Sequence, residues 1–376
     1  MADRSRSSNL RRFGRAGVGQ VVAFFVGLAI VVGIFAFAVP RFADYGAVWD
    51  ALQTLTPIEL WSLLAATVFN LFTYWWANMA ALPGLRLWPS AVVTQTGTSI
   101  ANTLPAGGAV AVGVTYAQLN SWGFTGDEAA LFVGVSGLWN IFAKLMLPLV
   151  SLGLLVATGS TYPALVGVAA LGIVVLAVAV ALLVLLFRSE RLARRIGDGL
   201  GRGASAVLRP FRRGPITGLG ERAVVFRRES VLLVRRRWIW LTLTTLLGHL
   251  ALWFVLVLSL RHMGVDAQEL PTVEILAVFS FSRLLSALPI TPGGVGVIDL
   301  GYIAGLIALD QTPGSQAQIV AGVLLFRLLT FGIQIPLGGV TYLIWRAKKS
   351  WMRDTPPPGS VAAELDAAGQ LGSAVD

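Results

Sequence analysis

Cysteine is absent from the 376-residue chain, and charged residues make up only 13% of it. The lack of cysteine excludes disulfide bonds, thiolate metal sites, iron–sulfur clusters and cysteine nucleophiles. Soluble domains carry about 25% charged residues, whereas 56% of this chain is hydrophobic and its mean hydropathy is +0.74. The composition therefore predicts a membrane protein.

Long apolar runs take the place of the missing charge. A helix needs roughly 20 apolar residues to cross the hydrocarbon core of a bilayer. Six runs meet this requirement: 20–39, 58–82, 129–157, 162–187, 238–260 and 317–346. The first run is longer than the apolar part of a signal peptide, so we expect an uncleaved anchor. The fold class expected is an all-α polytopic membrane protein with six full spans.

Basic residues are concentrated in three segments beside these runs. Most of the 29 Lys and Arg residues lie in 1–19, in the arginine-rich segment 188–237, or just after the last run at 346–353. Lys and Arg are enriched in cytoplasmic loops, so we predict that these segments and both termini lie on the cytoplasmic side of the cell membrane. We expect the arginine-rich segment to lie on anionic lipid, not on nucleic acid. The chain then divides into a basic N-terminus, a membrane domain at 20–350 and a disordered tail at 351–376.

Two further apolar regions, 83–128 and 271–316, do not fit as full spans. The orientation of the six spans requires the first region to enter and leave on the cytoplasmic side, and the second on the outer side. Irregular backbone at membrane depth is tolerated only where it is buried in protein or lines a wet cavity. We therefore predict two re-entrant helical hairpins. Their turn motifs comprise Pro105, Gly107 and Gly108 in the first hairpin, and Pro292, Gly293, Gly294 and Gly296 in the second.

Each predicted hairpin lies between two spans, which gives one unit at 58–157 and another at 238–346. The predicted orientations make the two units opposite in direction across the membrane. Inverted repeats with broken helices near the bilayer midplane are typical of alternating-access transporters. The pattern therefore favours a transporter.

Four charged residues lie well inside the apolar segments: Lys144, Arg283, Arg327 and Asp299. Each charge costs about 2.5–3.5 kcal/mol or more at the centre of a membrane helix. The carboxylate can pair with one of the cations, which still leaves two cations uncompensated. A phosphate suits such a site, because the planar fork of arginine binds phosphate oxygens in pairs. We predict that a substrate is bound by the four charged residues with Asn102 and Asn140; Gln334 is a further neutral candidate.

The second turn motif carries a resemblance to a known family. Arg283, the pattern P-x-T-P-G-G-x-G-x-x-D at 289–299 and Arg327 resemble the flippase-like membrane domain of lysylphosphatidylglycerol synthases, a family that includes stand-alone relatives. The resemblance extends over about 20–350. It implies movement of lipid head groups between leaflets: aminoacylated phosphatidylglycerol in the bifunctional enzymes, and polyprenyl-phosphate-linked sugars in some relatives. It also implies that the outer half of the substrate path is formed by Arg283, Pro292, Gly293, Gly294, Gly296, Asp299 and Arg327.

The sequence departs from the family pattern in two places. Asp299 stands where the family commonly has glutamate, and Gly108-Ala109-Val110 lacks the acid and base that often follow the first glycine. The second departure argues against a cationic, aminoacylated substrate, which would need carboxylates. Only 23 residues, 354–376, follow the last basic cluster. We therefore expect no synthase activity, and a protein that is not an enzyme.

Two alternatives remain open on sequence grounds. One is a scaffold that binds partner proteins in the membrane without transport. The other is an intramembrane serine protease, because Gly134-Val135-Ser136-Gly137 matches a rhomboid-like GxSG and His249 lies midway along the fifth span. The sequence has no HExxH and no GxxxxGK[ST], so we expect no metal and no cofactor. The expected partners are anionic lipid head groups, with a second copy of the chain or a separate lipid-modifying enzyme as further candidates.

Overall fold

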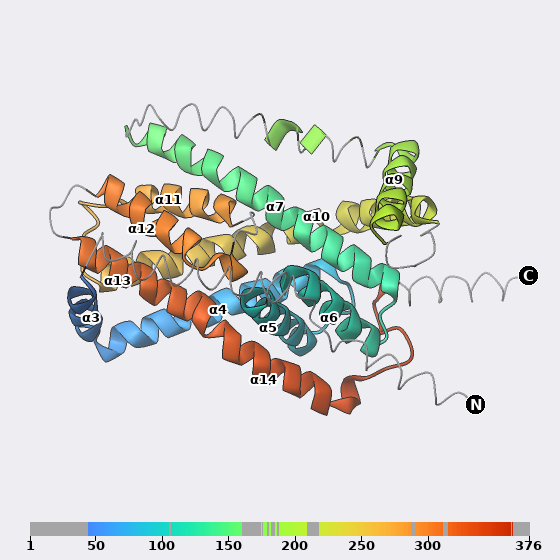
Figure 1. Cartoon of the computed structure of the whole chain (residues 1–376), viewed down its shortest axis with the longest axis horizontal. Coiled ribbons are helices and arrows are strands. Elements are labelled where there is room, and N and C mark those ends of the chain that lie inside the picture. The colour runs from blue at the N-terminus through green and yellow to red at the C-terminus, as the bar shows by residue number, and fades with distance from the viewer. Residues whose placement is uncertain are drawn as a thin grey trace, which may run out of the picture.

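The computed structural model consists of helices wherever it describes the chain, apart from short turns and connections (Figure 1). It describes residues 44–104, 107–159, 188–208, 218–286, 291–310 and 315–361, with residue 363 and a few separate positions between 174 and 185. No strand occurs in these ranges, so the expected all-α class is confirmed for them. The predicted spans at 20–39 and, for the most part, 162–187 lie outside the described residues.

Long helices occupy the other four predicted spans. They are α4 (Pro57–Ala81), α7 (Gly126–Ala157), α10 (Leu219–His262) and the pair α13 (Gln316–Arg327) and α14 (Gln334–Ala347). A π-helical turn, Leu328–Gly332, joins α13 to α14. Three segments, α7, α10 and Gln316–Ala347, are each long and apolar enough to cross a membrane. The fourth, α4, meets that requirement together with α3 (Tyr45–Gln53), from which it turns by 97°.

Two of the long helices begin with the same local motif. Thr56 and Glu59 form a capping box at the start of α4, and Thr125 and Glu128 form one at the start of α7. In each, the threonine hydroxyl accepts from the backbone N–H of the glutamate, and the carboxylate accepts from the backbone N–H of the threonine. These bonds satisfy N–H groups that a helix start otherwise leaves without partners, so the sequence T-x-x-E fixes where both helices begin.

The two regions predicted as hairpins are each a pair of helices separated by a break. The first pair is α5 (Leu87–Thr103) and α6 (Gly107–Ser121), and the second is α11 (Thr272–Leu285) and α12 (Val297–Leu309). The second break contains a 3-10 turn at Pro292–Gly294 and three glycines with positive φ, Gly293, Gly294 and Gly296, at 59°, 71° and 83°. Glycine adopts these angles without the steric cost that other residues incur, which explains why the motif is rich in it.

The pairs lie toward different ends of the molecule. In Figure 1, α11 and α12 lie toward the end that carries α3, and α5 and α6 lie nearer the end that carries α9 (Glu190–Leu208). Each pair also packs against the last span of the other unit: α5 lies along α14, and α11 lies along α7, while α4 and α10 pack against each other. The packing of the two units is therefore reciprocal.

Exposed tryptophans gather near both ends of the bundle. Trp49 and Trp61 lie beside the corner between α3 and α4, and Trp238 and Trp240 follow the basic part of α10. Tryptophan is enriched at membrane–water interfaces. From Trp240 to His262, α10 rises about 33 Å, close to the roughly 30 Å thickness of the hydrocarbon core. The two groups of tryptophans are therefore separated by about the thickness of the hydrocarbon core of a bilayer.

The chain after α14 is more ordered than expected. The backbone N–H of Arg353 donates to the carbonyl of Ser121 at 3.0 Å, and Ser360 is fully buried beside Gly84. The prediction of a disordered tail from residue 351 is thus wrong for 351–361, because this proline-rich stretch packs across the loops at both ends of the α5–α6 pair. Residues 364–376 lie outside the described part of the chain.

Adjacent glycines in α14 allow a test of the packing between α5 and α14. Gly338 is buried against α5, where a Cβ would overlap the Gln95 carbonyl and the Ser99 side chain, whereas Gly339 is exposed with nothing near. We expect G338A to lower the free energy of unfolding by about 1–3 kcal/mol through overpacking. Thermal unfolding in detergent, followed by tryptophan fluorescence, measures the change.

The matched control is G339A, which adds the same methyl group without a clash. Alanine is a better helix former than glycine by about 1 kcal/mol, so we expect G339A to unfold at or slightly above the wild-type temperature. Equal unfolding temperatures for the two variants would contradict the close contact between α5 and α14.

Candidate functional site

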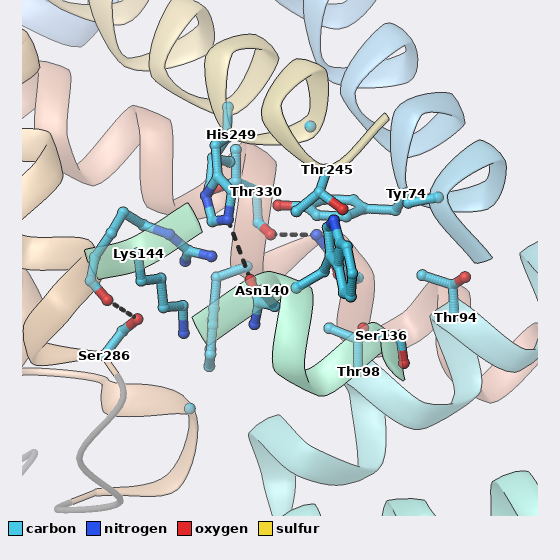
Figure 2. Close-up of a pocket in the computed structure, with 18 of the residues that line it drawn as sticks. Tyr74, Thr94, Thr98, Ser136, Asn140, Lys144, Thr245, His249, Ser286 and Thr330 are labelled. Carbon is cyan, nitrogen blue, oxygen red and sulfur yellow. Dashed lines mark hydrogen bonds between the residues drawn. The ribbon is translucent and has the colours of Figure 1, made fainter. Parts of the chain in front are cut away.

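A cavity of about 500 Å³ lies inside the bundle, between α4, α5, α7, α10, α11 and the α13–α14 segment. Figure 2 shows its polar side chains reaching inward from several of these helices. Five of the six predicted substrate-binding residues line it: Asn102, Asn140, Lys144, Arg283 and Arg327. The sixth, Asp299, is not among the lining residues but contacts Arg327. Residues from both units therefore meet in one place.

Asp299 forms an ion pair with Arg327. The carboxylate Oδ1 lies 2.5 Å from the Arg327 Nε, and the Asp299 side chain is only 2% exposed. Its other oxygen, Oδ2, accepts from the backbone N–H of Gly296 at 2.7 Å, at the start of α12. A carboxylate is stabilised at a helix N-terminus by the free N–H groups and the helix dipole. Asp299 thus joins the start of α12 to the end of α13.

Arg327 also contacts an aromatic ring. Its guanidinium lies over the ring of Phe331 at 4.5 Å from the centroid, a favourable cation–π contact. Phe331 belongs to the π-helical turn and packs against Gly293 of the broken segment. Turns of this kind often occur at functional sites. Here the wider turn presents Arg327, Thr330, Phe331 and Gln334 to the same cavity.

Lys144 and Arg283 form no ion pair within the described part of the chain. The Nε of Arg283 is buried without a hydrogen-bond partner there. With Arg327, the cavity holds three cations next to one carboxylate. A buried charge without a partner is strongly unfavourable, so the arrangement suits an anion that enters the cavity.

His249 and Asn140 are bonded to each other across the cavity wall, with 3.1 Å between His249 Nε2 and Asn140 Oδ1 (Figure 2). His249 is 2% exposed, and its Nδ1 has no partner among the described groups. The hydroxyl of Ser136 donates to the carbonyl of Phe132 in its own helix at 2.6 Å. A serine–histidine dyad is therefore not formed, and the protease alternative finds no support in this geometry.

The turn residues differ in what they do. All three glycines of the second break have positive φ, and of the three only Gly293 also lines the cavity. Gly107 lies against the backbone of Ile100 and Ala101, which leaves no room for a side chain. Gly108 has nothing near it, so the structure gives no steric reason for glycine there. Pro292 begins the 3-10 turn, and Pro105 lies outside the described residues.

Several hydroxyl-bearing residues of the cavity were not expected from the sequence: Tyr74, Thr94, Thr98, Ser136, Thr244, Thr245, Ser286, Tyr302 and Thr330. The spacing of some of them is a usable signal, because Thr94, Thr98 and Asn102 recur every four residues, as do Ser136, Asn140 and Lys144. Residues four apart lie on one face of a helix. Polar residues at this spacing within apolar helices therefore indicate Thr94, Thr98 and Ser136, but not all of the other hydroxyl residues.

Acidic residues and histidines do not gather into a metal site in the described ranges, where no group of three such side chains could hold an ion. The polar groups that line the cavity include guanidinium, ammonium, amide and hydroxyl groups. These groups bind an anion and donate hydrogen bonds.

The sequence was compared with protein families and with curated proteins, and the family match covers the helices that form the cavity. No curated protein matches the chain. A family profile described as "Lysylphosphatidylglycerol synthase TM region" matches residues 24–338, which include every helix from α3 to α13 and the cavity. Together with the long apolar helices, this match identifies a membrane-embedded protein. The chain belongs to the lysylphosphatidylglycerol synthase transmembrane-region family.

Proposed function

We propose that the protein moves a lipid with an anionic, phosphate-bearing head group between the leaflets of the cell membrane, without covalent catalysis. The observation that carries the proposal is the cavity with Lys144, Arg283 and Arg327; of these, Arg327 alone has a carboxylate partner among the described residues. Intramembrane charges are costly and as a rule functional. A phosphate would compensate the two free cations and accept several charge-assisted hydrogen bonds.

The reciprocal packing of the two helical units supports alternating access. Each unit consists of a span, a broken helix pair and a second span, and each pair packs against the last span of the other unit. We propose that the units are inverted repeats and that both broken pairs are re-entrant hairpins. Transporters of this kind bind substrate at the repeat interface, which is where the cavity lies.

The position of the cavity along α10 indicates which leaflet of the membrane lies nearer to the cavity in this conformation. The lining residues of α10 run from Leu241 to Leu252, directly after the exposed Trp240 and before Arg261 at the far end. If both termini and the arginine-rich segment are cytoplasmic, this is the cytoplasmic half of the span. We therefore propose that the described conformation faces the cytoplasmic leaflet.

Neutralising the two free cations tests transport. In liposomes with acyl-labelled phosphatidylglycerol, we expect K144Q and R283Q each to slow the exposure of inner-leaflet label to an external quencher. A charge-assisted hydrogen bond is worth about 1.5–3 kcal/mol, which corresponds to a loss of at least about tenfold in rate. The rate of quenching per reconstituted protein is the measurement.

The control is R346Q, which makes the same chemical change at an exposed arginine outside the cavity. It should move lipid at the wild-type rate. Equal rates for all four proteins would remove the cations from the mechanism, and the absence of lipid movement by any of them would favour the scaffold alternative.

The ion pair of α12 and α13 allows a separate test of structure against transport. Removal of one member of a buried pair costs about 3–5 kcal/mol, because the other charge is left unpaired. We therefore expect D299N and R327Q each to unfold at a lower temperature in detergent, and D299N/R327Q to recover part of that loss. Lipid movement should stay low in the double variant, because the arginine is still missing.

Two results would contradict this assignment. If D299N unfolded at the wild-type temperature, Asp299 would not stabilise the buried arginine. If the double variant regained both stability and lipid movement, Arg327 would serve the fold alone.

A further inference from the structure

The cavity has two chemically different ends. Figure 2 shows Lys144, His249 and Ser286 on one side and Tyr74, Thr94, Thr98, Ser136 and Thr245 on the other, with Asn140 and Thr330 between them. The first side holds positive charge and one hydroxyl, that of Ser286, which donates to the Arg283 carbonyl, whereas the second side holds several hydroxyl groups.

One face of α7 contains the whole change in polarity. Ser136, Asn140 and Lys144 follow one another at intervals of four residues, and all three line the cavity. Residues at this spacing lie on one side of a helix, and eight residues of helix rise about 12 Å. The cavity therefore changes from hydroxyl to amide to ammonium along about two turns of helix.

Two other helices change in the same direction. Thr94, Thr98 and Asn102 line the cavity from α5, with the amide next to Gly293 of the broken segment. On α10, Thr245 precedes His249 by one turn. Three helices from both units thus agree on the direction of the change, so it belongs to the cavity as a whole.

The hydroxyl end has unused hydrogen-bonding capacity. Asn78 donates to Thr94 at 2.7 Å, and Thr94 donates to the carbonyl of Ser90. The hydroxyls of Thr98 and Thr245 have no hydrogen-bond partner among the described residues. Threonine in a membrane helix commonly donates to a carbonyl of its own helix, so free hydroxyls that face a cavity can bind a ligand.

Charge is missing from the hydroxyl end. No aspartate or glutamate lines the cavity within the described ranges, and its three cations, Lys144, Arg283 and Arg327, come from α7, α11 and α13. An ammonium group would find no carboxylate, and a second phosphate would find no further cation. A neutral group with several hydroxyls fits, because it both donates and accepts hydrogen bonds.

We infer that the head group carries an uncharged polyol beyond its phosphate, with the phosphate at Lys144, Arg283 and Arg327 and the polyol at the Thr98 and Thr245 end. This inference rests on the proposed function and narrows the substrate to phosphodiester lipids of glycerol, inositol or a sugar. The same geometry disfavours lipids whose head group ends in an ammonium.

Four lipids with identical short acyl chains test the inference by titration calorimetry of the protein in detergent. Phosphatidylglycerol and phosphatidylinositol carry a polyol, phosphatidylethanol has the same phosphodiester charge without a hydroxyl, and phosphatidylethanolamine carries an ammonium. We expect at least one polyol lipid to bind about tenfold more tightly than phosphatidylethanol, as two or more neutral hydrogen bonds would give. The two polyol lipids distinguish a glycerol from a ring polyol.

The variant T98V/T245V replaces both hydroxyls by methyl groups of similar size. It should bind the preferred polyol lipid as weakly as phosphatidylethanol and leave the affinity for phosphatidylethanol unchanged. The matched control is T103V on α5, since Thr103 donates to the Ser99 carbonyl and does not line the cavity. T103V should keep the wild-type preference.

The outcomes separate this inference from the proposed function. If wild type binds phosphatidylethanol or phosphatidylethanolamine as tightly as both polyol lipids, or if T98V/T245V keeps the preference, the polyol inference is wrong. The anionic-lipid proposal survives that result provided that R283Q weakens every anionic lipid. If R283Q weakens none of them, both fail.

Discussion

Uncompensated positive charge inside an apolar bundle is the constraint on which the other features depend. One carboxylate, Asp299, balances one guanidinium, Arg327, and two more cations face the same cavity with no ion-pair partner in the part of the chain that the structure describes. Such a cluster is unfavourable in an empty, dry interior, and its repulsion is relieved when an anion binds. This charge imbalance is the feature on which the proposed binding of an anionic head group rests.

The backbone around the cavity is irregular beside the charged residues. The break between α11 and α12 brings Asp299 to a helix start, where it accepts from Gly296, and the π-helical turn after Arg327 places Phe331 over the guanidinium. Irregular backbone at membrane depth requires a protein-lined or wet surrounding. The irregular backbone and the buried charges thus stabilise each other: the free backbone N–H of Gly296 donates to the Asp299 carboxylate, and the π-helical turn brings an aromatic ring to Arg327.

Features that depend on composition and spacing were predictable from the sequence, and features that depend on the three-dimensional fold were not. Length and apolarity locate α4, α7, α10 and the α13–α14 segment, and the cost of intramembrane charge singled out Lys144, Arg283 and Arg327. The choice of Arg327 as the partner of Asp299 depends on how α12 and α13 meet. Thr98 and Thr245 could not be predicted as cavity residues, because threonine is common in apolar helices. The packing of 351–361 could not be predicted either, because it depends on loops far away in the sequence.

The reciprocal contacts place α5 against α14 and α11 against α7, and the chain after α14 bonds to the end of α6. The last apolar segment changes neighbours at the π-helical turn: α13 packs against α10 and α12 before it, and α14 packs against α5 after it. A change of angle at this turn would shift α14 and α5 relative to α12 and would move Arg327, which directly precedes the turn. Under the proposed transport function, lipid release and the reorientation of the helices would be coupled at this one turn.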